Sequence, residues 1–327
     1  MSSSTGAGPG LPGTGGPTKP QPRMIPVGGG KGGVGKTFVV ANLGTALARM
    51  GYRVVTVDGD LEGANLHTCL GVSQPSASLA DYVAHREEDL GKLALETATP
   101  NLRLIAATGG NLATPQPGHA RRVQLLRELR KLPADFVLID LGAGTHPAVM
   151  DYFMVGDDGV IVVSPEPTSV ENAYSFLRAA FYRRLRLSMV SYDVRRVVTL
   201  AMDESNERGI RTPLDLLREV QALDKTEGKR FVEAMRAFRP RVLINGVRTA
   251  QDVQLGFSVR SICRKYFGFD AEYLGYVNFD DGVRRSVRSR RPLLELAPRC
   301  DASIYLARVA NKLAATAPAA SQGAATR

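Results

Sequence analysis

The segment from Gly30 to Thr37, GKGGVGKT, constrains the fold more than any other part of the sequence. It fits the pattern G-x-x-x-x-G-K-[ST] of a phosphate-binding P-loop. Its glycines allow backbone N–H groups to close around an anion at the start of a helix, where the helix dipole is positive. Lys36 is expected to neutralise the β- and γ-phosphates, and the Thr37 hydroxyl to bind Mg²⁺. The predicted nucleotide-binding residues of the loop are Gly30, Lys31, Gly32, Gly33, Val34, Gly35, Lys36 and Thr37.

The residues on either side of this loop place it between a strand and a helix. Met24 to Val27 is a short apolar run directly before it. Residues 38–49 carry apolar side chains at helical spacing, and Gly51 follows as an end signal. A strand, a loop and a helix in this order are typical of an α/β domain. Pro26 departs from this pattern, because a proline removes one ladder hydrogen bond from a central strand.

Two further apolar runs end in carboxylates. Residues 53–57 lead into Asp58, Gly59 and Asp60, and residues 136–139 lead into Asp140. Open parallel sheets bind ligands at the carboxyl ends of their strands, so these acids are expected at the same edge as the P-loop. Asp140 has the position of a Walker B acid that holds a Mg²⁺-bound water. We therefore predict an α/β fold, with a mostly parallel twisted sheet and helices on both faces.

Lys31, the second residue of the loop, adds a charge that an ordinary P-loop does not need. The run KGGVGKT resembles the deviant Walker A ATPases of the MinD/ParA superfamily. The segment DLGAG, which starts at Asp140, is most similar to FlhG-like and MinD-like members. The resemblance implies a P-loop NTPase of the MinD/ParA type, in which Lys31 reaches across a dimer interface to the partner's nucleotide. The alternative for Lys31 is a solvated loop residue.

Other segments resemble the same superfamily and imply further roles. VDGDLEGANL, residues 57–66, resembles switch I, in which Asp58 supports the Mg²⁺ shell and Asp60 positions or activates the attacking water. A plain Asp-Gly-Asp turn is the alternative there. Gly144 resembles the switch II glycine that senses the γ-phosphate, and Asn245 the residue that reads the adenine edge. The resemblance thus implies Lys31, Lys36 and Asp60 as catalytic residues, Gly144 and Asn245 as additional nucleotide contacts, and Thr37, Asp58 and Asp140 as metal-binding residues.

The function implied by this resemblance is that of a nucleotide switch with ATP and Mg²⁺ as cofactors. ATP would drive homodimerisation, and slow hydrolysis, stimulated by a protein partner, would dissolve the dimer. Such proteins position cell-division machinery, chromosomes or plasmids, flagella or other polar assemblies. The alternatives are an Mrp-type iron–sulfur carrier and a cobyrinic-acid-type ATP-dependent synthetase. Cys69, Cys263 and Cys300 form no C-x-x-C pair, which disfavours the carrier, and Lys31 disfavours the synthetase.

The positive charge of the chain is concentrated in one region. The net charge is +10, and residues 178–299 carry all of it. This region holds two arginine clusters, which are candidates for non-specific binding to DNA or to an anionic membrane surface. Solvated helix ends are the alternative. The clusters comprise Arg178, Arg183, Arg184 and Arg186 in the first, and Arg284, Arg285, Arg288, Arg290 and Arg291 in the second.

Composition also predicts the domain boundaries. Residues 1–22 are rich in Gly, Pro, Ser and Thr and are expected to form a disordered tail, and residues 314–327 a second flexible end. The ATPase domain would span residues 23–313, with a helical insertion at about 188–240 that begins a helix at Thr212 and Pro213. This insertion is expected either to carry a partner site or to cover the sheet edge.

Localisation is predicted from the absence of targeting features. The three scattered cysteines, and the lack of a secretory signal or of about 20 consecutive apolar residues, predict a cytoplasmic protein. Association with the nucleoid or membrane is expected only in the ATP state. No bulky apolar residue follows Leu313, so a C-terminal amphipathic membrane helix is not expected.

Overall fold

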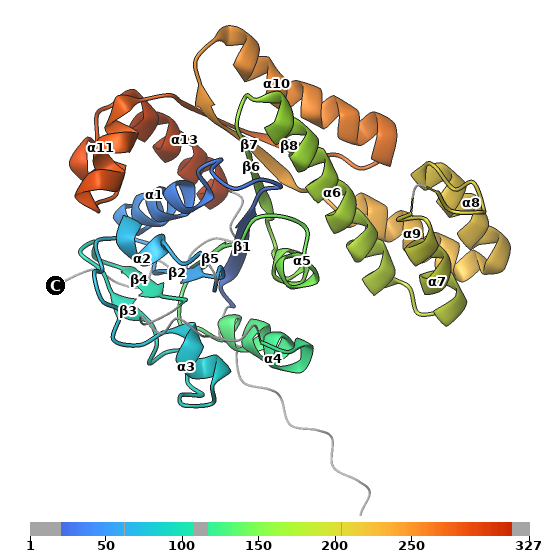
Figure 1. Cartoon of the computed structure of the whole chain (residues 1–327), viewed down its shortest axis with the longest axis horizontal. Coiled ribbons are helices and arrows are strands. Elements are labelled where there is room, and N and C mark those ends of the chain that lie inside the picture. Colours follow the sequence, from blue (N-terminus) through green and yellow to red (C-terminus); the bar gives the residue numbers. More distant parts are fainter. Residues whose placement is uncertain (1–20, 62, 108–116, 204, 316–327) are drawn as a thin grey trace, which may run out of the picture.

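The computed structural model describes residues 21–61, 63–107, 117–203 and 205–315 (Figure 1). Within these residues the strands form one eight-stranded sheet in the order β3-β4-β2-β5-β1-β6-β7-β8. Neighbouring strands are parallel, except that β3 is antiparallel to β4. The strands are β1 (Arg23–Gly28), β2 (Val54–Asp58), β3 (Leu95–Glu96), β4 (Leu102–Ile105), β5 (Phe136–Asp140), β6 (Val160–Val163), β7 (Arg241–Val247) and β8 (Glu272–Asn278).

Helices cover both faces of the sheet, as predicted. One face packs on α1, α2, α12 and α13, and the other mainly on α3 to α6, α9 and α10. A π-helical turn, η1 (Cys263–Phe267), continues α10. The α-helices are α1 (Lys36–Arg49), α2 (Leu66–Cys69), α3 (Leu79–Val83), α4 (His119–Leu129), α5 (Pro147–Met154), α6 (Pro167–Ser188), α7 (Tyr192–Leu200), α8 (Pro213–Leu223), α9 (Lys225–Ala237), α10 (Ala250–Ile262), α11 (Asp281–Ser289), α12 (Leu293–Leu296) and α13 (Asp301–Ala315).

The central strands explain both the apolar runs and the exceptional Pro26. Strands β2 and β5 are buried along their whole length, as expected of parallel strands covered on both faces. The oxygen of Val27 accepts a hydrogen bond from Leu141 on the β5 side, whereas Met24 exchanges hydrogen bonds with Asp157 on the other side. Pro26 shares the orientation of Met24, and β6 pairs with β1 only from Val27 onward. Its missing N–H therefore removes no hydrogen bond from the β1–β5 ladder.

The region between α6 and β7 is helical and packs on the far half of α6. Helices α7, α8 and α9 surround the end of α6 that lies away from the P-loop (Figure 1). Thr212 caps α8 through a reciprocal capping box with Asp215, and Pro213 occupies the first turn. Val194, Leu216 and Phe231 of these helices are buried in the same apolar core as the sheet. A docking role for this region remains a prediction.

The structure extends the predicted carboxyl end of the domain. Helix α13 continues to Ala315, two residues past the boundary predicted at 313, because its apolar side up to Leu313 packs into the core. Most of the two predicted tails, residues 1–20 and 316–327, lies outside the described residues. Among the helices that the structure describes, none is long and apolar enough to cross a membrane.

Candidate functional site

The carboxyl edge of the central strands brings the predicted site residues together. The P-loop follows β1, Asp58 and Asp140 are the last residues of β2 and β5, and Asn245 lies in the second half of β7. Strands β2, β5, β1, β6 and β7 are consecutive in the sheet, so these residues meet although they are distant in sequence. This is the edge at which open α/β sheets bind ligands.

The P-loop is shaped by two left-handed glycines and by close contact with α6. Gly33 and Gly35 have φ angles of 81° and 93°, a region that favours glycine. A Cβ atom on Gly30 would lie 1.9 Å from the backbone oxygen of Asn172 in α6, so this position requires glycine. Helix α1 begins at Lys36 without a side-chain cap. Its first N–H groups are therefore available to an anion.

Lys36 is buried between the loop and the acids. Its Nζ donates to the Lys31 carbonyl oxygen at 3.5 Å. Burial lowers the pKa of Lys36, an effect opposed by the charges of Asp140 and Asp60. A buried ammonium that has exchanged water for few hydrogen bonds gains strongly from an incoming phosphate. The predicted role of Lys36 therefore fits its position.

Asp58 and Asp140 form a buried pair of carboxylates. They are directly opposite each other in the β2–β5 ladder, and their side chains are 0% and 3% exposed. Burial and the charge of Asp140 raise the pKa of Asp58 to about 8, although hydrogen bonds from the N–H groups of Leu66 and Asp60 oppose this. Burial likewise raises the pKa of Asp140 to about 7, against a hydrogen bond from Thr37 and the charge of Lys36. Two such carboxylates need a cation to stay ionised.

The donor set fits Mg²⁺. Oδ1 of Asp140 is buried without a hydrogen-bond partner, beside the Thr37 hydroxyl that bonds to the same side chain. Hydroxyl and carboxylate oxygens are the ligands that Mg²⁺ prefers, usually with water and phosphate completing the shell. In the part of the chain that the structure describes, no group of three or more His, Cys, Asp or Glu side chains could hold a metal by itself. Thr37 and Asp140 would hold the ion directly or through water, and Asp58 would support them.

Switch I and switch II lie in contact. The N–H of Gly59 donates to the Asp140 carbonyl oxygen at 2.8 Å, which links the two strand ends. A Cβ atom on Gly142 would lie 3.5 Å from the Asp60 carboxyl carbon, so Asp60 lies against the switch II backbone. Gly144 has a φ of 87°, which explains the glycine there. Asp60 is thus near the predicted metal position, and its action on water remains a prediction.

Asn245 lies beside the P-loop. Its side-chain amide donates to the Val34 carbonyl oxygen at 2.9 Å, and a Cβ atom on Gly35 would lie 2.4 Å from that amide nitrogen. In this structure Asn245 therefore supports the loop. Contact with an adenine edge remains a prediction.

Lys31 has partners in its own chain that sequence reasoning missed. Its Nζ donates to Thr168 Oγ1 at 3.1 Å and lies 3.5 Å from Glu166 Oε2. Both partners belong to the start of α6, in the segment SPEPTSVENAY that resembles the superfamily's passage from strand to helix. Pro167 is a local signal for the start of a helix. Nothing in the sequence, however, shows that this helix start lies beside Lys31.

The two arginine clusters differ in exposure. In the first cluster only Arg186 is exposed: Arg183 pairs with the buried Asp151, and Arg178 donates to the Met202 carbonyl oxygen at 3.2 Å. The arginines of this cluster therefore mainly make contacts within the folded domain. In the second cluster, on α11 and just after it, all five arginines are exposed. Helix α11 packs against α2, the helix that follows switch I.

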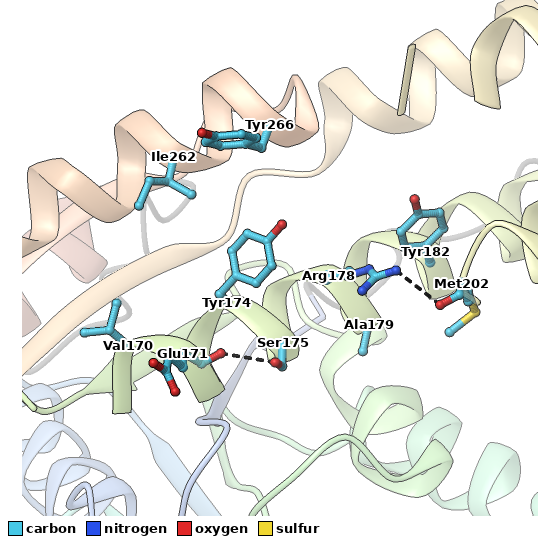
Figure 2. Close-up of a pocket in the computed structure, with 10 residues that line it drawn as sticks. All are labelled: Val170, Glu171, Tyr174, Ser175, Arg178, Ala179, Tyr182, Met202, Ile262 and Tyr266. Carbon is cyan, nitrogen blue, oxygen red and sulfur yellow. Dashed lines mark hydrogen bonds between the residues drawn. The ribbon is translucent and has the colours of Figure 1, made fainter. Parts of the chain in front are cut away.

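A surface groove of about 660 Å³ lies between α6 on one side and α10 with η1 on the other. Figure 2 shows Tyr174 and Arg178 of α6 on one side and Ile262 and Tyr266 of α10 and η1 on the other. Glu171 lies at the same face, with its carbonyl oxygen accepting a hydrogen bond from Ser175. Helix α6 therefore has one face on the P-loop and another on this groove.

Among the residues that the structure describes, the three cysteines do not belong to a group of three or more possible metal ligands. All three are free. Burial raises the pKa of Cys69 to about 11 and that of Cys263 to about 12.

A P-loop at the start of a helix, beside two buried aspartates at neighbouring strand ends, defines a P-loop nucleotide-binding protein. More narrowly, the CobQ/CobB/MinD/ParA nucleotide binding domain family (CbiA) matches residues 25–293, and the chain belongs to this family. The predicted family and the predicted fold class are therefore confirmed, and the chain carries an ATPase domain of the MinD/ParA type.

Individual relatives agree with this assignment. The chain is 26% identical over 294 residues to the antiactivator FleN of Pseudomonas aeruginosa, covering 89% of this chain and 86% of FleN. It is 36% identical over 152 residues to the septum site-determining protein MinD of Synechocystis, covering 46% of this chain and 56% of that MinD. In structure it is similar to MinD from Pyrococcus horikoshii complexed with Mg-ADP, with a TM-score of 0.62 and 20% identity over 89% of this chain and 95% of that one.

Proposed function

We propose that this protein is an ATP-dependent switch that binds ATP with Mg²⁺, pairs with a second copy of itself and hydrolyses ATP slowly. The observation that carries the proposal is the buried Asp58–Asp140 pair beside Lys36 and Thr37, where burial raises the pKa of both carboxyls and a bound Mg²⁺ would favour their ionised form. Bound Mg²⁺ would supply positive charge to the phosphates. The MinD of known structure was complexed with Mg-ADP, which supports this choice of cofactors.

The residues of the chain would divide the work. The α1 N-terminus and Lys36 bind the phosphates, Thr37 and Asp140 hold the metal, and Asp60 orients water from the switch I side. Lys31 is 43% exposed at the P-loop, so it is accessible to a second subunit. These positions support pairing of two copies through the carboxyl edge of the sheet. Hydrolysis stimulated by a protein partner would then separate them.

The cellular role we propose is positioning or control of an assembly, such as division machinery, chromosomes, plasmids, flagella or other polar structures. The names of FleN, an antiactivator, and of MinD, a septum site-determining protein, support a regulatory rather than a metabolic role. The exposed arginines of α11 support contact with an anionic surface. Val287 is the exposed large apolar residue of this helix, so there is little to insert into lipid, and DNA is the favoured surface.

The test uses Asp60→Ala, sedimented with plasmid DNA or with anionic liposomes in the presence of ATP or ADP. We expect ATP-dependent dimers in light scattering, loss of turnover, and pelleting with DNA at low salt. Arg284→Glu, Arg285→Glu and Arg288→Glu together should abolish pelleting, and Arg186→Glu is the matched control. Lys31→Ala should bind ATP but remain monomeric. Wild-type turnover in Asp60→Ala would contradict the switch I assignment, and pelleting with liposomes alone would make the surface a membrane.

A further inference from the structure

Helix α6 presents a stripe of residues to the P-loop. Thr168, Asn172 and Phe176 are four residues apart and so lie on one side of the helix. A Cβ atom on Gly28 would lie 2.6 Å from the Phe176 ring, and one on Gly30 would lie 1.9 Å from the Asn172 oxygen. The loop and the first turns of α6 are thus fixed against each other. Glu166, at the N-cap of α6, and Thr168 are therefore held at a constant position relative to Lys31.

The ammonium of Lys31 is directed toward this stripe. Its hydrogen bond to Thr168 Oγ1 is 3.1 Å long, and Glu166 Oε2 lies 3.5 Å away. Both contacts are made within one chain. A lysine that reaches a nucleotide in another subunit has to move its Nζ away from α6, and the short contacts to Thr168 and Glu166 are then lost.

We propose that Glu166 and Thr168 are positioning residues that hold Lys31 within its own subunit until a partner's nucleotide replaces them. This inference rests on the proposed cross-interface role of Lys31. The contacts then favour the monomer and set how much ATP is needed for pairing. Each contact is partly exposed, so its effect is small per subunit, about two- to five-fold. A symmetric dimer releases two lysines, so the dimerisation constant would change by about four- to twenty-five-fold.

The first test measures the holding contact without reference to the dimer. Nucleotide-free wild type, Glu166→Gln and Thr168→Val are treated with an amine-reactive reagent, and labelling of Lys31 is followed by peptide mass spectrometry. We expect labelling about two- to five-fold faster in both variants. Glu171→Gln is the matched control, because Glu171 is on the same helix and lines the groove beside α10 (Figure 2). Equal rates in all four proteins would overturn the proposal.

The second test measures the consequence. The dimerisation constant is obtained by sedimentation equilibrium with Mg²⁺ and a non-hydrolysable ATP analogue, and monomer affinity by a fluorescent nucleotide. We expect tighter dimers in Glu166→Gln and Thr168→Val, with unchanged affinity for the first nucleotide and unchanged behaviour of Glu171→Gln. Weaker dimers would mean that the contacts orient Lys31 productively, and would overturn the proposal. A wild type that stays monomeric would refute the proposed switch itself, and faster labelling would then no longer support a role in pairing.

Discussion

At the amino edge of the sheet, buried charges are paired, whereas at the carboxyl edge two buried carboxylates lie side by side. At the amino edge, Arg241 bonds to Asp158 at 3.0 Å and to Glu272 at 2.9 Å, and Arg23 also pairs with Asp158. At the carboxyl edge, Asp140 has the charge of Lys36 and a hydrogen bond from Thr37 beside it, and Asp58 accepts backbone hydrogen bonds from Leu66 and Asp60. Buried charges are costly unless they are paired. The difference between the two edges supports the proposed cation and phosphate site at the carboxyl edge.

The largest expected effect is on the free energy of unfolding, at the amino edge. Arg241→Met should lower the free energy of unfolding by about 3 kcal/mol, because it removes the arginine that joins Asp158 to Glu272 and leaves the buried Asp158 with Arg23 alone. The control is Arg103→Met, whose partner Glu96 is exposed, and here the loss should stay below about 1 kcal/mol. Urea unfolding measures both. Similar losses in the two variants would show that the amino edge is not a buried ionic network.

At the carboxyl edge we expect an effect of similar size, on the affinity for nucleotide. Lys36→Ala should weaken nucleotide binding roughly 100-fold or more, about 3 kcal/mol, because phosphate charge would face the two aspartates without compensation. Lys131→Ala, at an exposed lysine paired with Glu128, should bind normally. Calorimetric titration with Mg-ADP measures the difference. Tight binding by Lys36→Ala would refute the P-loop assignment.

Replacing an aspartate by asparagine should change the free energy of unfolding in opposite directions at the two edges, by a smaller amount. Asp58→Asn should stabilise the nucleotide-free protein by roughly 1–3 kcal/mol, less than the pKa shift alone suggests, because the amide also loses a hydrogen bond. Asp135→Asn at the amino edge should instead destabilise it, since hydrogen bonds from Arg53 outweigh burial and lower the pKa of Asp135. Thermal unfolding at pH 8 without nucleotide separates the two. Destabilisation by both substitutions would contradict the expected difference between the amino edge and the carboxyl edge.

The pH dependence follows from the same pKa directions. Asp58 and Asp140 titrate at about 8 and about 7 in the folded protein instead of at 3.8. Between these values the folded state holds more protons than the unfolded chain, so stability should fall as pH rises from about 4 to about 8. Asp135 acts in the opposite sense, because its contribution is present above its ordinary pKa and is lost as pH falls. In Asp58→Asn the decline near neutral pH should be shallower than in the wild type.

The carboxyl edge could be predicted because its signals are local. Each of Asp58 and Asp140 directly follows a run of buried apolar residues, and parallel strands align such ends automatically. The start of α8 is likewise marked by a local signal, because Thr212, Pro213 and Asp215 lie within four residues of one another. Pairs such as Lys31 with Thr168, or Arg241 with Asp158, could not be predicted. Nothing in a single sequence states which of many distant charged residues will meet.

The sequence by itself therefore determined the loop, the strand ends and the parallel α/β class, because glycine conformation, burial and periodicity act over a few residues. The tertiary structure decided which arginines are exposed, since Arg183 is drawn to Asp151 while the α11 arginines face solvent. It also decided that Pro26 faces β6 rather than β5 and that the Lys31 side chain contacts the start of α6. These outcomes depend on packing between segments that lie 32 residues apart for Arg183 and Asp151 and 137 apart for Lys31 and Thr168, which only the folded chain brings together.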